Sequence, residues 1–227
     1  MPICINYYGQ PRELERTKRM YDEFLASASH DVYICYTTWD TESINEFREL
    51  FPNAYIRQIP LPDTEALYSE IINRFSIDPT NSSRKSMTHY ILGLYIKKHS
   101  YYTIEQLSRD IGATFDVVVS LRTDVYLYDC IIKDMYDHML TTFKPNTVFV
   151  ANAPKFNIYG EFGLPDVFYI SDIPTMKKIL FQLDILEECA VPGYQFFHPE
   201  TSFHVSLVRM GLSIIELPLR AFPQPLH

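Results

Sequence analysis

The first part of the chain alternates short apolar runs with segments of helical apolar spacing. The apolar runs are typical of β-strands, whereas the intervening segments repeat their apolar side chains every three to four residues, as the buried stripe of an α-helix does. Strands are predicted at residues 2–8, 31–38 and 54–59, and helices at residues 12–28, 41–51 and 64–75. This alternation predicts an α/β fold with a parallel sheet.

The second half continues this pattern around the strongest strand signal in the sequence. Residues 115–121 are β-branched and apolar on both faces, as expected for a central parallel strand that helices cover. Helices are predicted at residues 86–111, 131–143, 173–186 and 199–210, strands at residues 147–151, 166–171 and 212–217, and a loop at residues 154–165. We therefore expect a single α/β domain, a Rossmann-like mixed and mostly parallel central sheet of about six strands flanked by helices.

Charge and glycine content exclude several classes of protein. The 227 residues include 20 basic and 28 acidic side chains, so the formal net charge is −8. Proteins that coat nucleic acid or lie on an anionic membrane need a basic face, and we therefore predict no nucleic-acid partner. With only 7 glycines, the chain contains no glycine-rich phosphate loop of the P-loop or GxGxxG type.

The sequence also predicts the cellular compartment. No basic segment followed by an apolar run opens the chain, and no apolar stretch reaches the roughly 18 residues of a membrane span. The four cysteines are far apart and fit neither a metal motif nor a disulfide scaffold. We expect reduced thiols in a cytoplasmic protein, located in the host cytoplasm if the protein is viral.

Candidate chemistry lies directly after the strand at residues 115–121. In open α/β sheets, ligands bind beyond the carboxyl ends of the strands, and this strand ends in Arg122-Thr123-Asp124. A carboxylate at this place can hold a divalent cation whose other ligands are the phosphate oxygens of a nucleotide. The alternative is an ion pair between Arg122 and Asp124 that closes the strand end.

Six segments along the chain resemble motifs of one group of enzymes. Residues 115–127 resemble the segment D-h-V-h-x-x-R-x-D-h-x-h, where h is apolar, of the glycosyltransferases of large DNA viruses (the chlorovirus and giant-virus type) and of bacterial polysaccharide clusters. The other landmarks follow the same order as in that group: the Gly9-Gln10-Pro11-Arg12 turn, residues 31–35, Ser86-Met87 with Tyr90, residues 165–172 with Met176, and His198-Pro199-Glu200 with Leu207 and Gly211.

This resemblance implies a GT-A glycosyltransferase with one domain over residues 1–227. The nucleotide-binding part would cover about residues 1–128 and the acceptor part about residues 129–227. The chain would be the N-terminal domain of a longer protein if it follows a common arrangement of such viral enzymes. The implied reaction moves a hexosyl or deoxyhexosyl group from a UDP- or GDP-sugar to a glycan or glycoprotein acceptor.

The resemblance also implies Mn²⁺ or Mg²⁺ on the donor diphosphate, held by a D-x-D-type motif. This chain departs from that motif, because Arg122 stands where the first carboxylate is expected and only Asp124 is left. Asp124 would then hold the metal while Arg122 contacts a phosphate or the donor sugar. Alternatively, the guanidinium offsets the diphosphate charge directly and no metal is needed.

Four further residues are candidates for contacts with the donor nucleotide. Gln10 and Arg12 follow the first strand, where such folds receive the base and phosphates, although a helix-start turn with a solvated Arg explains them equally well. Thr38 and Asp40 follow the second strand and are candidates for the base or ribose. The alternative for Asp40 is an N-cap of the following helix.

The remaining candidates concern the diphosphate, the acceptor and the metal. Arg84 and Lys85 would close over the diphosphate, or else form a solvated basic pair. Asp166 and Glu161 are candidates for the base that takes the proton of the attacking hydroxyl. His198 would complete the metal site, or else be an ordinary loop residue. Two other functions stay open: a nucleotidyltransferase or related nucleotide-sugar enzyme, and a carbohydrate-binding module without catalysis.

Overall fold

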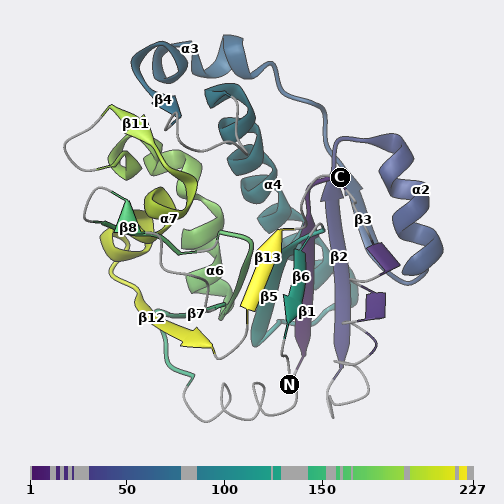
Figure 1. The fold of residues 1–227 in the computed structure, drawn as a ribbon. Coiled ribbons are helices and arrows are strands. Elements are labelled where there is room, and N and C mark those ends of the chain that lie inside the picture. The colour runs from purple at the N-terminus through teal and green to yellow at the C-terminus, as the bar shows by residue number, and fades with distance from the viewer. Residues whose placement is uncertain are drawn as a thin grey trace.

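A seven-stranded mixed sheet forms the centre of the protein (Figure 1). The computed structural model describes residues 2–10, 14–15, 18–19, 22, 31–77, 86–123, 125–128, 143–151, 157–158, 161–164, 166–191, 195–217 and 220–223. In spatial order the strands are β12 (Ser213–Leu217), β7 (Thr147–Ala151), β10 (Phe168–Ser171), β5 (Val117–Arg122), β1 (Ile3–Tyr8), β2 (Val32–Thr38) and β3 (Tyr55–Gln58). Strand β10 runs antiparallel to its neighbours β5 and β7, and the other neighbours pair in parallel. The predicted α/β fold with a mixed, mostly parallel sheet is confirmed.

Helices cover both faces of this sheet. They are α2 (Thr41–Leu50), α3 (Thr64–Arg74), α4 (Met87–Ile111), α6 (Ile173–Leu180), the 3₁₀ helix η1 (Gln182–Cys189) and α7 (Pro199–Arg209). The oxygen or nitrogen of a polar side chain caps the first turn of each α-helix, as helix N-termini require: Asp40, Asp63, Ser86, Asp172 and His198. The described positions between β1 and β2 are also helical at residues 14, 15, 18, 19 and 22, within the helix predicted at residues 12–28.

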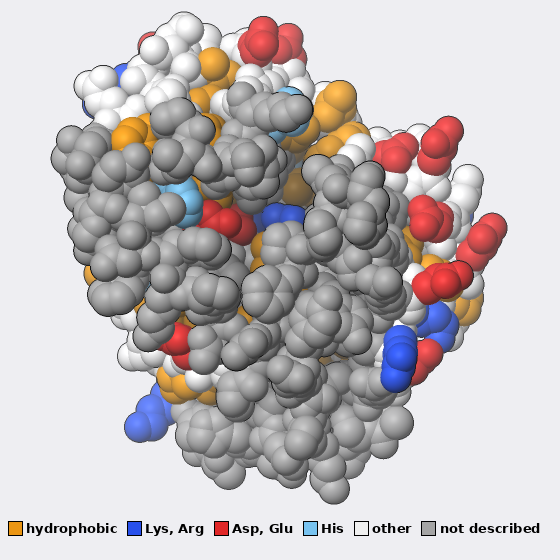
Figure 2. Space-filling view, viewed as in Figure 1, with side chains coloured by type: hydrophobic (Ala, Val, Ile, Leu, Met, Phe, Trp, Pro, Cys, Tyr) orange, Lys and Arg blue, Asp and Glu red, His pale blue; other side chains and the backbone are white. Residues whose placement is uncertain are grey.

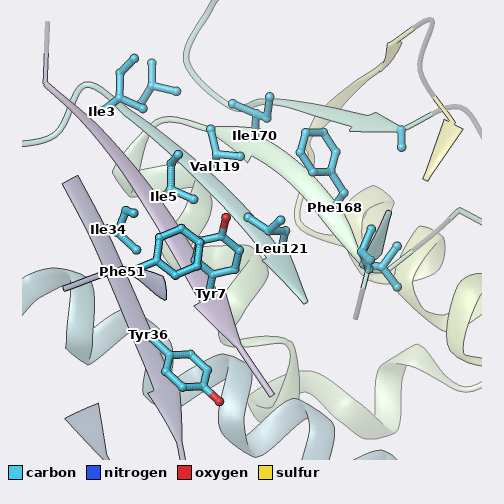
Figure 3. Close-up of a cluster of buried hydrophobic side chains, with 14 of the residues drawn as sticks. Ile3, Ile5, Tyr7, Ile34, Tyr36, Phe51, Val119, Leu121, Phe168 and Ile170 are labelled. Carbon is cyan, nitrogen blue, oxygen red and sulfur yellow. The ribbon is translucent and has the colours of Figure 1, made fainter. Parts of the chain in front are cut away.

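Two hydrophobic clusters lie on opposite faces of the sheet because successive strand residues point to opposite sides. On one face, Ile3, Ile5 and Tyr7 of β1 pack with neighbouring strands and with Phe51 at the end of α2 (Figure 3). On the other face, Cys4 of β1 and Val118 of β5 belong to a cluster that side chains of α4, α6 and α7 complete. Burial of both faces explains why the central strands are apolar on both sides.

Three small two-stranded sheets differ from the sequence prediction. They pair β4 (Ser76–Ile77) with β11 (Phe196–Phe197), β6 (Val125–Tyr128) with β13 (Arg220–Pro223), and β8 (Asn157–Ile158) with β9 (Glu161–Phe162). The last pair lies within the segment predicted as a loop at residues 154–165. Such short strands were missed because runs of two to four residues are too short to show an alternating pattern.

One predicted helix is wrong in extent, and one lies outside the described residues. The segment predicted as a single helix at residues 173–186 ends as an α-helix at Leu180, and the 3₁₀ helix η1 follows it. Ile185 has non-helical dihedral angles inside η1. The buried Leu183 and Leu186 nevertheless continue the apolar spacing of the sequence, and this spacing extended the predicted helix beyond the end of the α-helix. The predicted helix at residues 131–143 lies outside the described residues except for its last position.

No helix in the described part of the chain is long and apolar enough to cross a membrane. Cys4, Cys35 and Cys189 are buried and free, as predicted for reduced thiols, whereas Cys130 lies outside the described residues.

Candidate nucleotide-binding site

The order of the strands places a topological switch point between β1 and β5. From β1 the chain builds outward through β2 to β3, and it then returns along α4 to add β5 on the other side of β1. The carboxyl ends of β1, β2 and β5 therefore meet at one edge, and the antiparallel β10 begins at this same edge. Open α/β sheets bind ligands in the crevice at such a point.

The turn after β1 is fixed to both neighbouring strands. Gly9 has a φ of +99°, a backbone conformation that L side chains rarely adopt. The hydroxyl of Tyr36 in β2 donates a hydrogen bond to the Gly9 carbonyl oxygen at 2.8 Å. On the β5 side, the backbone N–H of Thr123 donates to the Tyr8 carbonyl at 3.3 Å, and its hydroxyl donates to the carbonyl of the exposed Gln10. Hydrogen bonds to its backbone carbonyl groups thus hold the turn in place. Arg12 lies outside the described residues.

Arg122 is the last residue of β5 and is half-buried at the switch point. It lies in register with Tyr8 of β1, and its backbone N–H donates to the Val167 carbonyl at 3.0 Å. Burial raises the pKa of the Tyr8 phenol well above its ordinary value, and the positive charge of Arg122 opposes this increase. As register partners in neighbouring strands, Tyr8 and Arg122 project from the same face of the sheet, whereas Asp124 lies outside the described residues.

The side chains of Thr38 and Asp40 accept hydrogen bonds from backbone N–H groups in and after the turn between β2 and α2. The Thr38 hydroxyl accepts a hydrogen bond from the Asp40 N–H at 3.1 Å. The Asp40 carboxylate is the N-cap of α2: it accepts from the Glu42 N–H at 3.2 Å and from the Ser43 hydroxyl. The hydrogen bond from Ser43 lowers the pKa of the Asp40 carboxyl. The capping alternative for Asp40 is confirmed, and a contact of either side chain with a nucleotide stays a prediction.

Asp166 forms a buried ion pair with Lys97 of α4. The Lys97 ammonium lies 3.4 Å from Oδ2 of Asp166, and the two side chains are 4% and 5% exposed. The Lys97 nitrogen also lies 5.9, 5.7 and 5.2 Å from the ring centroids of Tyr8, Tyr169 and Phe203. Such contacts between a cation and aromatic rings stabilise a desolvated ammonium. The pair joins the middle of α4 to the start of β10.

Lys97 was missed in the sequence because no motif contains it. A signal was present, since buried residues of α4 recur at Tyr90, Leu94, Tyr101 and Ile104, and Lys97 falls on the same stripe. A charged residue on the apolar stripe of a helix is almost never buried unless it is paired. This rule predicts a buried acidic partner, although it does not name which one.

His198 and Glu200 lie together at the start of α7. The His198 Nδ1 accepts a hydrogen bond from the Thr201 N–H at 3.4 Å and lies 3.4 Å from Oε2 of Glu200.

Glu161 belongs to β9, but its side chain lies outside the described part, as do Arg84 and Lys85 altogether. Figure 2 shows a basic, an acidic and a His side chain next to one another near the middle of one face of the molecule.

The described residues do not form a metal site among themselves. Within the part of the chain that the structure places, no three His, Cys, Asp or Glu side chains are grouped so that they could hold a metal ion. The Nδ1 of His198 is occupied as the N-cap of α7. The predicted metal ligand Asp124 falls outside the described residues, so both metal contacts stay predictions.

The comparisons with known proteins find matches among solved structures. No protein-family model matches the sequence, and no curated protein matches it significantly. Among solved structures, the chain is similar to a glycosyltransferase involved in the glycosylation of the major capsid of PBCV-1, with 12% sequence identity and a TM-score of 0.48. The match covers 96% of this chain and 81% of that chain.

Proposed function

We propose that the protein transfers a sugar from a nucleoside-diphosphate sugar to a glycan or glycoprotein acceptor. The observation that carries this proposal is the switch point between β1 and β5, with the Gly9 turn on one strand and Arg122 at the end of the other. Ligands of open α/β sheets bind at such a place. The resemblance of the sequence motifs to viral glycosyltransferases supports a sugar nucleotide as the ligand.

Arg122 is the proposed partner of the donor diphosphate. A guanidinium offers a planar fork of N–H donors that matches two phosphate oxygens at once. During transfer, negative charge builds up on the leaving diphosphate, so a fixed cation that touches it stabilises the transition state. Asp124, Arg84 and Lys85 are proposed to act beside Arg122 on the same group, either through a divalent metal at Asp124 or directly through the two basic side chains.

Asp166 is the proposed base on the acceptor side, with Glu161 as the other candidate. A base must come within hydrogen-bond distance of the attacking hydroxyl. Asp166 lies at the correct edge of the sheet, since it directly precedes the segment that pairs with the end of β5. Its carboxylate already contacts Lys97 and is buried, so the role requires the acceptor hydroxyl to reach a buried carboxylate.

A thermal-shift panel tests the proposal against its alternatives. The full chain is heated with nucleoside monophosphates, diphosphates, triphosphates and sugar nucleotides, each with and without Mn²⁺. We expect UDP or GDP and the matching sugar nucleotide to raise the melting temperature most, because binding to the native state stabilises it. Stabilisation by triphosphates alone points to a nucleotidyltransferase. No response to any nucleotide points to a carbohydrate-binding module and contradicts the proposal.

A further inference from the structure

Trp39 lies between Thr38 and Asp40 in the turn after β2. Thr38 and Asp40 hold the backbone of that turn, as described above, whereas the Trp39 side chain is half-buried. It packs against a cluster of Tyr8 in β1, Ile59 after β3 and Ile96 in α4. One part of the indole is therefore fixed by packing, and another part is open to solvent at the ligand-binding edge of the sheet.

Trp39 and Arg122 lie on the same face of the sheet, on either side of Tyr8. Trp39 packs against the cluster that contains Tyr8, and Tyr8 is the register partner of Arg122. Trp39 directly follows β2, and the strands β2, β1 and β5 are neighbours in this order. Two strand spacings separate the first from the last, or about 10 Å. This separation suits an extended nucleotide, whose base and diphosphate lie at opposite ends of the ribose.

We propose that Trp39 is the surface on which the nucleobase of the donor stacks while Arg122 binds the diphosphate. This inference rests on the proposed function, because it takes a nucleoside diphosphate as the ligand. An indole that is held by packing on one side loses little conformational freedom when a flat base covers its open side. Stacking on an aromatic ring is available to every base, so Trp39 contributes affinity for both purine and pyrimidine nucleotides.

The single tryptophan of the chain makes the contact directly measurable. Because Trp39 is the only tryptophan, the intrinsic tryptophan fluorescence reports on this position alone. UDP and GDP are titrated into the full chain, and inorganic pyrophosphate serves as the ligand that lacks a base. We expect saturable quenching by at least one of the two nucleotides and no comparable quenching by pyrophosphate. Equal quenching by pyrophosphate overturns the stacking contact.

Two leucine variants separate stacking from general packing. Trp39→Leu keeps an apolar side chain on the Tyr8 cluster but removes the flat ring. Tyr33→Leu removes another half-buried aromatic ring, near the start of β2 and away from Trp39, where Tyr33 packs on Phe115. Calorimetric titration is expected to show a nucleotide dissociation constant at least about fivefold higher for Trp39→Leu, and an unchanged constant for Tyr33→Leu.

The outcomes distinguish this inference from the proposed function. Nucleotide binding that is unchanged in Trp39→Leu, with no fluorescence change in the wild type, overturns the inference and leaves the proposed function intact. Absence of any nucleoside-diphosphate binding to the wild type contradicts the proposed function and removes the inference with it. If Trp39→Leu does not fold, Trp39→Phe replaces it: this variant keeps a stacking ring, and a large loss of nucleotide affinity in it overturns the inference.

Discussion

We expect binding of the nucleotide donor to depend on Arg122 more than on any other side chain. Arg122→Lys keeps the positive charge but loses the planar fork that meets two phosphate oxygens. We expect the dissociation constant of the nucleotide donor to rise at least about tenfold, which is about 1.4 kcal/mol, with little change in melting temperature. Calorimetry on the purified variant measures the constant.

A second arginine provides the control for this substitution. Arg109 lies in the last turn of α4, is exposed, and donates a hydrogen bond to Gln106. Arg109→Lys should leave both donor affinity and melting temperature unchanged. If Arg122→Lys behaves in the same way as Arg109→Lys, Arg122 does not contact the donor.

Gly9 matters through its backbone conformation. Its φ of +99° is unfavourable for any residue with a Cβ, although among the described residues that Cβ would meet the Thr123 hydroxyl at an ordinary 3.8 Å. We expect Gly9→Ala to lower the free energy of unfolding by about 1–2 kcal/mol. It should also weaken nucleotide binding, because the strained turn lies at the switch point.

The variant Gly112→Ala is a control that separates the loss of stability in Gly9→Ala from the loss of nucleotide binding. Gly112 has a φ of +65° at the end of α4, outside the turn after β1. Gly112→Ala should cost a similar free energy of unfolding, measured by urea denaturation, but leave nucleotide affinity unchanged. Equal nucleotide affinity in both variants contradicts a role of the Gly9 turn in binding.

A substitution of Asp124 tests the hypothesis that the Arg122-Thr123-Asp124 segment holds a divalent metal ion. Asp124→Asn removes the charge that a divalent cation requires but keeps the size of the side chain. We expect transfer activity to be abolished and the thermal unfolding of the apo-protein to be unchanged. A variant with near wild-type turnover in the presence of chelator shows that Arg122, and not a metal at Asp124, offsets the charge of the diphosphate.

At the scale of elements, the pair of Lys97 and Asp166 joins helix α4 to the start of β10. Removing one partner of a buried ion pair leaves the other charge uncompensated, so we expect Lys97→Met to cost about 3–5 kcal/mol of unfolding free energy. The double variant Lys97→Met, Asp166→Asn should recover at least half of that loss, because no buried charge is left. Urea denaturation measures all three proteins.

The neighbouring residue on α4 offers a matched control for Lys97. Lys98 pairs with Asp184 at the surface, where the two side chains are 25% and 47% exposed. Exposed pairs contribute little, and Lys98→Met should cost less than about 1 kcal/mol. Similar losses in Lys97→Met and Lys98→Met would contradict the buried, coupled pair described for α4 and β10.

The elements that the sequence predicted well are those with long, regular patterns. The central strand β5 and the long helix α4 were predicted within two residues at each end, because many apolar positions define their period. The antiparallel direction of β10 was not predicted, since the apolar pattern of a strand carries no direction. The end of α6 at Leu180 was also missed, because the apolar spacing continues into η1.

At the scale of the whole molecule, the sequence predicts where the candidate site lies in the fold but not the long-range contacts around it. Arg122 stands out in the sequence because it follows the most apolar strand, and the strand order confirms that this strand end lies at a switch point. The contact of Lys97 with Asp166 joins residues that are 69 positions apart, and no local pattern encodes such a contact. The same holds for Trp39 and the cluster that contains Tyr8, because the pairing of β2 with β1 brings them together.

The most direct test of the central claim is a crystal structure of the full chain with bound UDP or GDP. We predict that the diphosphate lies where β1 and β5 end, with its oxygens within hydrogen-bond distance of the Arg122 guanidinium, and that the base covers Trp39. A diphosphate at the Arg122 position with the base elsewhere would retain the proposed function and remove the role of Trp39. A nucleotide bound away from the ends of β1 and β5 would contradict the account.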